Sequence, residues 1–297
     1  MTVFACVLAR PLVLLLTVLL ALTGFAGQAM AGSALRPPDR EVTVMTYNIH
    51  HGEGDDGVLD LQRIVDVIRD SGADIVGLQE VDRFWLRSGG VDQEAALARE
   101  LGMHSCFGPN VIRDPGSSGD VTHYYGTLIL SRYPILECSN LYLPKETERQ
   151  EQRGLLETLI NVRGVPLRFY NTHLQHDSAN ARHIQVDAII EHIGQIDVPS
   201  VLVGDLNARP DDSELEPLYE HFVDAWDVAG TGEGYTIPVP VPTRRIDYVF
   251  VSPGIDVHDA QVIMNATTSV ASDHFPVVAE IALPGSEVGI GKGRAEK

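Results

Sequence analysis

Strand-length apolar runs that meet a short polar motif recur along this chain, and they constrain its fold more than any other feature. Val201–Val203 lead into Gly204-Asp205-Leu206-Asn207, and Ser272-Asp273-His274 lead directly into the apolar run 275–278. A sheet holds side chains at its strand ends rigidly but leaves them open to solvent, which suits a catalytic constellation. Similar junctions occur at Thr46-Tyr47-Asn48, Gln79-Glu80, Asn171-Thr172-His173-Leu174 and Arg245-Ile246-Asp247-Tyr248.

Amphipathic helices are predicted between these strands. Apolar residues spaced i, i+3, i+4 and i+7 occur over 61–68, directly after the N-cap residue Asp60, and the spacing recurs over 186–193 in a helix that begins near Ser178. The strands around these helices are expected at 42–48, 74–79, 166–172 and 199–204. Each half of the chain therefore reads as strand, helix, strand, which indicates an α/β domain of two similar sheets packed face to face with helices outside.

The remaining segments complete one domain over residues 42–283. Strands of a meander are expected at 126–131, 135–143 and 155–162. The Gly- and Pro-containing segment 231–242 is predicted to be irregular, and 114–120 is predicted to be a polar loop. The tail 286–297 has almost no apolar content and is predicted to be disordered.

The order of these motifs resembles that of the endonuclease/exonuclease/phosphatase superfamily, which has the DNase I-like fold. Each tripeptide alone occurs by chance in unrelated chains, but six in the family's order, each at a strand end, do not. The resemblance implies a four-layer α/β/β/α sandwich, in which two mixed sheets are flanked by helices. The residues that carry it are Asn48, Glu80, His173, Asp205 with Asn207, Asp247, and Asp273 with His274.

The resemblance implies a metal-dependent phosphoesterase. Glu80 is expected to bind the ion, because a hard cation such as Mg²⁺ (or Mn²⁺) keeps several waters and takes only one or two protein carboxylates. Asn48 resembles the amide that ties the metal ligand to the phosphate, and Asp273 is a further candidate ligand. Many nucleases of the superfamily carry an acid two residues after this amide, whereas this chain has His50. That departure weakens the case for a second, all-oxygen metal position.

The other motif residues are expected to act on the attacking water and the transition state. His173 resembles the histidine that donates a hydrogen bond to a phosphoryl oxygen. Asp205 and Asn207 lie two apart on a segment taken as extended, so their side chains are expected to point the same way. Asp247 and His274 resemble an acid–imidazole dyad in which the carboxylate fixes the tautomer. Either His274 or Asp205 can be the general base.

Two further residues and one further segment are candidates for substrate contact. Tyr125 and Arg153 each precede a predicted strand and are candidates for binding phosphate, although structural roles fit both equally well. The segment Arg83-Phe84-Trp85 follows the Glu80 motif and offers an aromatic and cationic clamp, but a buried tryptophan is the more usual finding.

The first 31 residues are predicted to be a secretory signal peptide. Arg10 is the only charge before a Leu- and Val-rich run over 12–22, and Ala29-Met30-Ala31 places small residues at a cleavage site before Gly32. The alternative is a membrane anchor, but Gly24 and Gly27 interrupt the run before it reaches a spanning length of about 20 residues. A secreted, extracellular protein is therefore expected.

Charge and cysteine content bear on the substrate and the compartment. The formal net charge of −19 repels polyanions at long range and provides no footprint for nucleic acid. Outside the predicted signal peptide the cysteines are Cys106 and Cys138, which form either a disulfide or two buried free thiols. The arginines that could still form a local basic patch are Arg83, Arg87, Arg132, Arg149 and Arg153.

The sequence thus predicts a secreted phosphoesterase that hydrolyses a phosphodiester by direct attack of water. A nuclease would need a basic groove, and a phospholipid or sphingomyelin phosphodiesterase would need an exposed apolar hairpin. Residues 231–243 show no aromatic wedge, and a small sugar phosphate or an envelope phosphodiester fits equally well. A non-catalytic binding module is disfavoured because the motif residues are intact. No protein partner is implied, and a monomer is expected.

Overall fold

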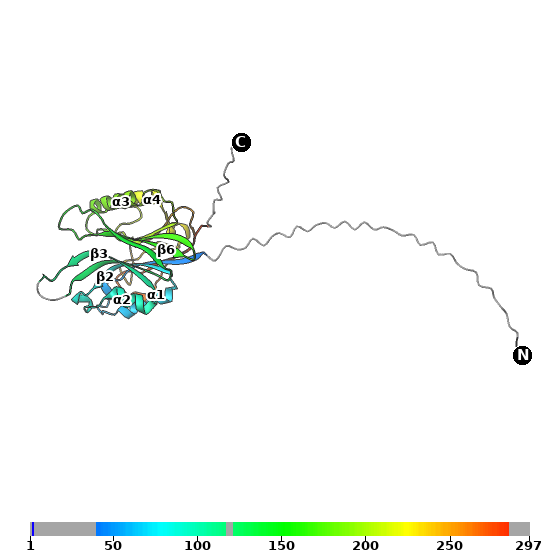
Figure 1. Cartoon of the computed structure of the whole chain (residues 1–297), viewed down its shortest axis with the longest axis horizontal. Coiled ribbons are helices and arrows are strands. Elements are labelled where there is room, and N and C mark those ends of the chain that lie inside the picture. Colours follow the sequence, from blue (N-terminus) through cyan, green and yellow to red (C-terminus); the bar gives the residue numbers. More distant parts are fainter. Residues whose placement is uncertain (1, 3–39, 117–120, 285–297) are drawn as a thin grey trace, which may run out of the picture. The chain divides into compact units, whose positions relative to one another are not determined.

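Two mixed six-stranded sheets form the centre of the computed structural model, which describes residues 2, 40–116 and 121–284 (Figure 1). In the first sheet β1 and β2 are parallel and the other neighbouring strands are antiparallel. Across this sheet the order is β11 (Asp256–Val262), β12 (Val277–Ala282), β1 (Glu41–Asn48), β2 (Ile75–Arg83), β4 (His123–Ser131) and β3 (His104–Arg113).

The second sheet repeats this plan. Its parallel pair is β7 and β8, and its other neighbouring strands are antiparallel. The parallel pair in each sheet is joined by a crossover helix, as the strand–helix–strand pattern of each half predicts. Across the second sheet the order is β5 (Ile135–Tyr142), β6 (Gly154–Val162), β7 (Val165–His173), β8 (Ser200–Asp205), β10 (Asp247–Val251) and β9 (Val223–Asp224).

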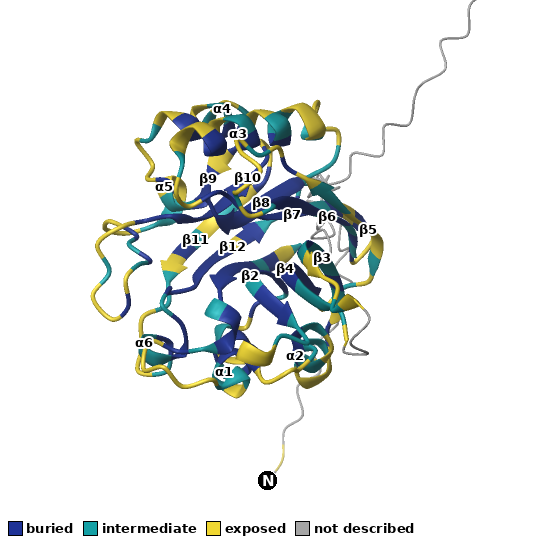
Figure 2. Ribbon diagram, turned by 90° about the vertical axis from the view of Figure 1, so that its left-hand side faces the viewer, coloured by how far each residue is buried: buried dark blue, intermediate teal, exposed yellow. Residues whose placement is uncertain are grey.

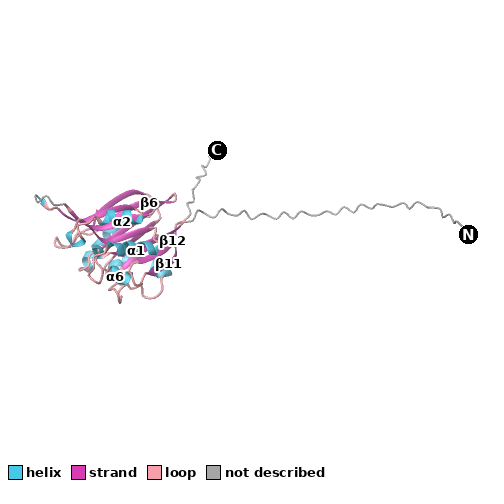
Figure 3. Ribbon diagram, turned by 90° about the horizontal axis from the view of Figure 1, so that it is seen from below, coloured by secondary structure: helices cyan, strands magenta, loops and turns pink. Residues whose placement is uncertain are grey.

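Helices cover the outer face of each sheet, so the predicted four-layer sandwich is confirmed. Seen from below, α1 (Leu61–Ser71), α2 (Gln93–Leu101) and α6 (Thr268–Ala271) lie over the first sheet (Figure 3). On the opposite side, α3 (Ala179–Ile193) and α4 (Glu216–His221) lie over the second sheet (Figure 1). The remaining short elements are α5 (Ala225–Ala229) and the 3₁₀ turns η1 (His50–Gly52), η2 (Leu86–Ser88) and η4 (Ser213–Leu215).

The two long helices begin where the sequence predicts. The carboxylate of Asp60 accepts a hydrogen bond from the Gln62 backbone N–H, and the Ser178 hydroxyl accepts one from Ala181. Such side-chain caps satisfy backbone donors that have no partner inside the helix and typically stabilise it by about 1 kcal/mol. Helix α1 ends at Gly72, whose φ of 71° lies in the left-handed region that favours glycine.

Alternation along the strands separates three apolar layers. Val44 and Ile75 pack between the two sheets, whereas their neighbours Met45 and Val76 face the helices of the first sheet. On the other side, Leu202 packs with the residues beneath α3. The buried layers run through the middle of both sheets while the helices keep exposed outer faces (Figure 2). Removal of a fully buried side chain here is expected to cost about 2–5 kcal/mol of stability.

The predicted meander is wrong in its connectivity. Strand β4 pairs with β2 and β3 in the first sheet, whereas β5 and β6 pair in the second. The chain therefore crosses from the first sheet to the second after Ser131. Strand periodicity does not reveal which sheet a strand joins, because strand pairing is a non-local contact. Strand β3 was not predicted, because it contains Gly108 and Pro109 and a register shift, features that an edge strand tolerates.

Cys106 on β3 and Cys138 on β5 form a disulfide, so the bridge rather than the pair of free thiols is present. It joins the edge strands of the two sheets.

The segment 231–242 contains no regular helix or strand, as predicted. Among the described residues no helix is both long and apolar enough to cross a bilayer. The predicted signal peptide 1–31 and tail 286–297 lie outside the described residues except for Thr2, and so does part of the loop 114–120.

Candidate active site

Asn48 and Glu80 meet at the ends of two parallel strands. Asn48 is the last residue of β1, and Glu80 lies on β2 where the register with β4 shifts between Leu78 and Val81. The irregularity gives Glu80 a φ of 61°, a conformation that costs a non-glycine residue about 1–3 kcal/mol. Its carboxylate accepts a hydrogen bond from the Asn48 side-chain amide over 3.2 Å. A bulge of this kind redirects one side chain out of the regular strand alternation.

Asn48 also connects the two sheets. The same Nδ2 donates to Asp205 Oδ2 on β8 over 3.0 Å, and the Asn48 backbone carbonyl accepts a hydrogen bond from the Ser272 hydroxyl over 2.7 Å. Asn48 is 1% exposed, so these contacts fix its orientation. The Asn48 side-chain amide therefore holds the carboxylates of Glu80 and Asp205 near the same nitrogen atom.

Asp205, Asp247 and His274 form a buried group on the second sheet. Antiparallel pairing of β8 and β10 sets Asp205 directly opposite Asp247. His274 Nδ1 lies 2.8 Å from Asp247 Oδ2, and its Nε2 lies 3.7 Å from Asp205 Oδ2. Because Nδ1 faces a carboxylate, it carries a proton and donates it in this hydrogen bond. The imidazole therefore bridges two acids.

Burial and charge set the protonation of this group. Burial and the neighbouring Asp247 raise the pKa of Asp205 to about 7, although His274 opposes the shift. Burial alone would lower the pKa of His274, but the carboxylates of Asp247 and Asp205 outweigh it and raise this pKa to about 10. At neutral pH His274 is therefore a cation between two acids, and the Asp205 carboxyl group titrates close to neutrality.

His173 also lies beside Asp205, but it is uncharged. The Arg153 guanidinium donates a hydrogen bond to His173 Nδ1 over 3.1 Å, which leaves the ring proton on Nε2. Nε2 lies 3.5 Å from Asp205 Oδ2. Burial, and then the positive charge of Arg153 and of His274, hold the pKa of His173 well below its usual range. His173 is thus a neutral donor whose tautomer is fixed by Arg153.

Asn207 is close to Asp205 but is not placed as predicted. Its backbone turns into the left-handed region with a φ of 51°, and its N–H donates to Asp205 Oδ1 over 3.0 Å. The side-chain amide donates to the Leu174 carbonyl over 3.1 Å. The segment is therefore a tight turn rather than an extended strand, and the expectation of parallel side chains is wrong. Asparagine tolerates this conformation because its short polar side chain bonds locally.

Tyr125 and Arg153 lie near other residues of the site. Both are buried, and Arg153 also pairs with Glu151 over 2.9 Å. Burial, followed by the charge of Glu80, raises the pKa of the Tyr125 hydroxyl well above its usual range. Tyr125 thus stays a neutral hydroxyl. The structure gives Arg153 a positioning contact to His173, and its role in binding phosphate stays a prediction.

Residues 45–274 match the endonuclease/exonuclease/phosphatase family. The chain belongs to the endonuclease/exonuclease/phosphatase family. Members of this family are hydrolytic phosphoesterases that generally depend on a divalent metal and act on phosphate esters such as nucleic acids or sugar phosphates.

Solved structures of the endonuclease/exonuclease/phosphatase family share the fold. A family protein from Beutenbergia cavernae is 31% identical with a TM-score of 0.71, over 83% of this chain and 72% of that one. The mannosyl-6-phosphatase of Bacteroides thetaiotaomicron is 21% identical with a TM-score of 0.64, over 82% of this chain and 100% of that one, which shows the fold alone.

Protein Cwh43 of Schizosaccharomyces pombe is 27% identical over 169 residues, 57% of this chain but 16% of that protein.

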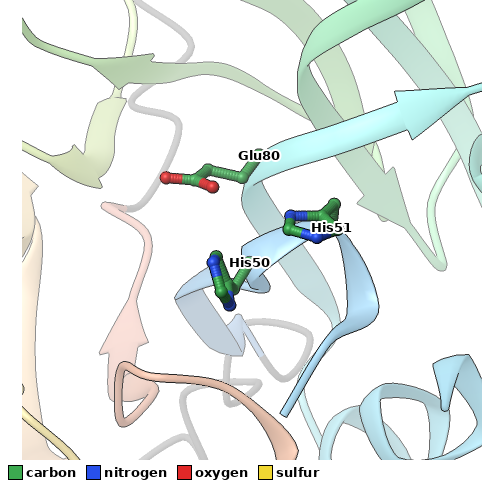
Figure 4. A group of neighbouring side chains, drawn as sticks. All are labelled: His50, His51 and Glu80. Atoms are coloured by element: carbon green, nitrogen blue, oxygen red, sulfur yellow. The ribbon is translucent and has the colours of Figure 1, made fainter. Parts of the chain in front are cut away.

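A second group of side chains that could hold a metal ion lies beside the first sheet. His50 and His51, in the turn after β1, lie beside Glu80 (Figure 4). Burial, and then the charges of Arg87 and His50, lower the pKa of His51. Among the described residues Asp273 belongs neither to this group nor to that of Asp205, Asp247 and His274. Sequence reasoning noted His50 only as a departure from the family pattern and missed His51.

Two buried amides behind the site were also missed. Gln79 Nε2 donates to Asn171 Oδ1 over 2.7 Å and lies 3.0 Å from the Thr46 hydroxyl. Asn171 in turn donates to the backbone carbonyls of Leu78 and Leu128 across the two sheets. The sequence did contain a signal for both amides. Gln79 directly precedes Glu80, and Asn171 lies two residues before His173. They rigidify the junction that holds Asn48 and Glu80.

Four of the five arginines considered for a local basic patch pair with carboxylates. Each of these guanidiniums lies within ion-pair distance of a carboxylate, which offsets part of its positive charge. Trp85 is half-buried, and the Arg113 guanidinium carbon lies 4.9 Å from its ring, so its face is already occupied. The pairs are Arg83 with Asp92 and Glu94, Arg87 with Asp82, Arg132 with Asp74, and Arg153 with Glu151.

Proposed function

We propose that this protein is a secreted, divalent-metal-dependent phosphoesterase that hydrolyses a phosphodiester by direct attack of water. The observation that carries the proposal is the charge arrangement around Asp205. A carboxyl group that titrates near neutrality lies between a protonated imidazole, His274, and a neutral imidazole, His173. Such opposed protonation states are typical of acid–base sites.

Asp205 is the group best suited to take the proton from the attacking water. A general base works best when its pKa lies near the working pH, and the pKa of Asp205 is about 7. His274 holds its proton up to about pH 10 and is therefore a poor base at neutral pH. Its positive charge instead stabilises the Asp205 carboxylate and the negative charge that develops on the phosphate.

His173 and the Glu80 region serve the phosphate itself. The fixed Nε2–H of His173 is available as a donor to a phosphoryl oxygen, because Arg153 occupies its other nitrogen. Glu80 and Asn48 are the residues proposed to hold the cation. When bound, a divalent cation neutralises charge on the phosphoryl oxygens. The Asn48 amide would then keep the cation ligand and the general base in register, since it contacts both acids.

The charge distribution favours a small or lipid-like ester over nucleic acid. The net charge is −19, and the arginines that would form a basic groove are paired with acids. Association of a polyanion would therefore lack the cationic footprint that dominates nucleic-acid binding. By the same reasoning, a sugar phosphate remains a candidate substrate.

A phospholipid or sphingomyelin phosphodiesterase is the second candidate, and a cavity supports it. A cavity of about 270 Å³ is lined by Arg209 and Arg244, close in sequence to Asn207 and Asp247. A cavity of about 580 Å³ shares Glu233 and Tyr235 with it. The larger cavity is also lined by apolar groups that suit a hydrophobic leaving group, namely Trp226, Pro242, Val262 and Met264.

A chromogenic diester separates a catalyst from a binding module. We expect hydrolysis of bis(p-nitrophenyl) phosphate by the protein with its divalent metal, and loss of that activity in EDTA. A panel of plasmid DNA, RNA, sphingomyelin, phosphoinositides and phosphomonoesters then ranks the substrates. No turnover of any of these with the full range of divalent ions would contradict the proposed function.

Secretion rests on residues 1–31 and has its own test. We expect the protein recovered from the culture medium to begin at or near Gly32, because Ala29 and Ala31 precede it. N-terminal sequencing of that protein is the measurement. A membrane-bound form that retains Met1 would contradict the proposed localisation.

A further inference from the structure

His50, His51 and Glu80 form a compact mixed nitrogen and oxygen site. Each residue offers one ligand atom, and these atoms all lie within 4.8 Å of one another. The two imidazole ring centroids are 4.6 Å apart and the rings are steeply inclined, so they do not stack (Figure 4). The ligand set of two imidazoles and one carboxylate differs from the all-oxygen set that Mg²⁺ prefers.

Hydrogen bonds leave a free lone pair on each member of this group. His50 Nδ1 lies 3.2 Å from the Glu53 carbonyl and therefore donates to it, which leaves Nε2 without a proton. His51 Nε2 lies 3.6 Å from the Glu53 carboxylate, which favours the proton on Nε2 and the lone pair on Nδ1. A carboxylate or carbonyl behind an imidazole is the usual arrangement that orients a metal-binding histidine.

His51 provides an independent sign that a ligand is missing. Its side chain is buried, and its Nδ1 has no hydrogen-bond partner among the described residues. A buried polar atom without a partner costs about 1–3 kcal/mol. A bound cation would satisfy this nitrogen, whereas a purely structural histidine would be expected to bond through both ring atoms.

The backbone also departs from regular geometry at all three positions. The φ values of His50, His51 and Glu80 are 43°, 46° and 61°. Each of these left-handed conformations costs a non-glycine residue about 1–3 kcal/mol, and such costs concentrate at functional sites. Without these turns the regular strand alternation would direct neighbouring side chains to opposite faces.

We propose that His50, His51 and Glu80 bind a divalent transition-metal ion of the Zn²⁺ or Co²⁺ type in preference to Mg²⁺. Imidazole favours these ions, whereas Mg²⁺ strongly prefers oxygen and dehydrates reluctantly. Two ligands of one tetrahedral ion lie about 3.4 Å apart, since each bond is about 2.1 Å. The ligand atoms of the group lie within 4.8 Å of one another. They must therefore approach by up to about 1.4 Å, and rotation of half-buried His50 provides part of this movement.

The inference deepens the cation requirement and rests on the proposed function for its catalytic meaning. The site next to Asn48 would then carry a more strongly polarising ion than the sequence alone indicates. Metal binding itself needs no substrate. Failure of the phosphoesterase proposal and failure of the metal proposal are therefore observed separately.

The test is direct metal binding to the full protein without a histidine tag. Isothermal titration with Zn²⁺ and with Mg²⁺ is expected to give a dissociation constant at least about 100-fold lower for Zn²⁺. Titration with Co²⁺ is expected to give visible absorption bands of a nitrogen-containing site. His50→Ala, His51→Gln and Glu80→Gln are each expected to weaken Zn²⁺ binding by at least about 10-fold.

Two control variants locate the ion. His183→Gln removes an exposed imidazole on α3 and is expected to leave Zn²⁺ affinity unchanged. Asp247→Asn alters the other candidate metal group, that of Asp205, Asp247 and His274, and is also expected to leave it unchanged. Circular dichroism checks that each variant is folded, and His50→Ala is the least disruptive because His50 is only partly buried. Equal affinity for Zn²⁺ and Mg²⁺, or Zn²⁺ loss in Asp247→Asn but not in His50→Ala, would overturn the proposal.

Discussion

The two groups of ionisable side chains at this site are built in opposite ways. Asp205, Asp247 and His274 lie at or beside regular strand ends, and all three are at most 4% exposed. His50, His51 and Glu80 lie in left-handed backbone, and His50 and Glu80 are only partly buried. The first group contains its own cation, the His274 imidazolium, whereas the second presents lone pairs, and the nearby Arg87 guanidinium is paired with Asp82.

The group of Asp205, Asp247 and His274 is suited to proton transfer, whereas the group of His50, His51 and Glu80 is suited to ion binding. A buried group that holds acids and a protonated imidazole together shifts pKa values strongly, because low dielectric strengthens each interaction. A group of unpaired ligand atoms near the surface remains reachable by an ion from solution. Asn48 joins the two groups through its single side-chain amide.

Removal of the cation is expected to have the largest effect. Chelation with excess EDTA should reduce hydrolysis of bis(p-nitrophenyl) phosphate to background, because Glu80 and its neighbours then stabilise no charge on the phosphate. Dialysis followed by addition of a divalent ion should restore the rate. Full activity in EDTA would remove the ion-binding role of His50, His51 and Glu80.

The next largest effect is expected from loss of the Asp247–His274 dyad. His274→Ala is expected to lower kcat by at least about 10², the lower range for a group that stabilises charge in the transition state. Asp247→Asn should also lower kcat, because it removes the carboxylate that lies 2.8 Å from His274 Nδ1. If the two residues act as one unit, the double variant loses much less than the product of the single losses. Multiplicative losses in proteins that remain folded would contradict the dyad.

The pH dependence distinguishes the roles of Asp205 and His274. Activity should rise as Asp205 loses its proton near pH 7 and fall as His274 loses its proton near pH 10. Asp247 raises the pKa of His274, so Asp247→Asn should move the alkaline limb of the kcat profile to lower pH. An alkaline limb that stays in place would show that a different group sets it.

The disulfide is expected to affect stability more than catalysis. Cys106 and Cys138 are 32 residues apart, so their replacement by serine should lower the free energy of unfolding by about 3–4 kcal/mol through the unfolded state. The rate constant kcat at 25 °C should change by less than about 2-fold, because neither cysteine contacts the candidate site. Denaturant unfolding and kcat are the measurements. A large loss of kcat in folded protein would tie the bridge to the site.

The sequence predicted the layers of this fold because its signals are local. Apolar alternation located β1, β2, β7 and β8, and helical spacing after Asp60 and Ser178 located α1 and α3. Motif order placed Asn48, Glu80, His173, Asp205, Asp247 and His274 at strand ends or junctions, and the structure brings them to one site.

Tertiary structure alone decided the remaining features, because they depend on contacts between segments far apart in the chain. Membership of β4 in the first sheet, the pairing of the arginines, and the Cys106–Cys138 bridge each join distant partners. The bulge at Glu80 and the turn at Asn207 overrode the extended geometry that residue spacing suggested. The sequence by itself determined which groups reach the site, and packing of the two sheets determined their charges and directions.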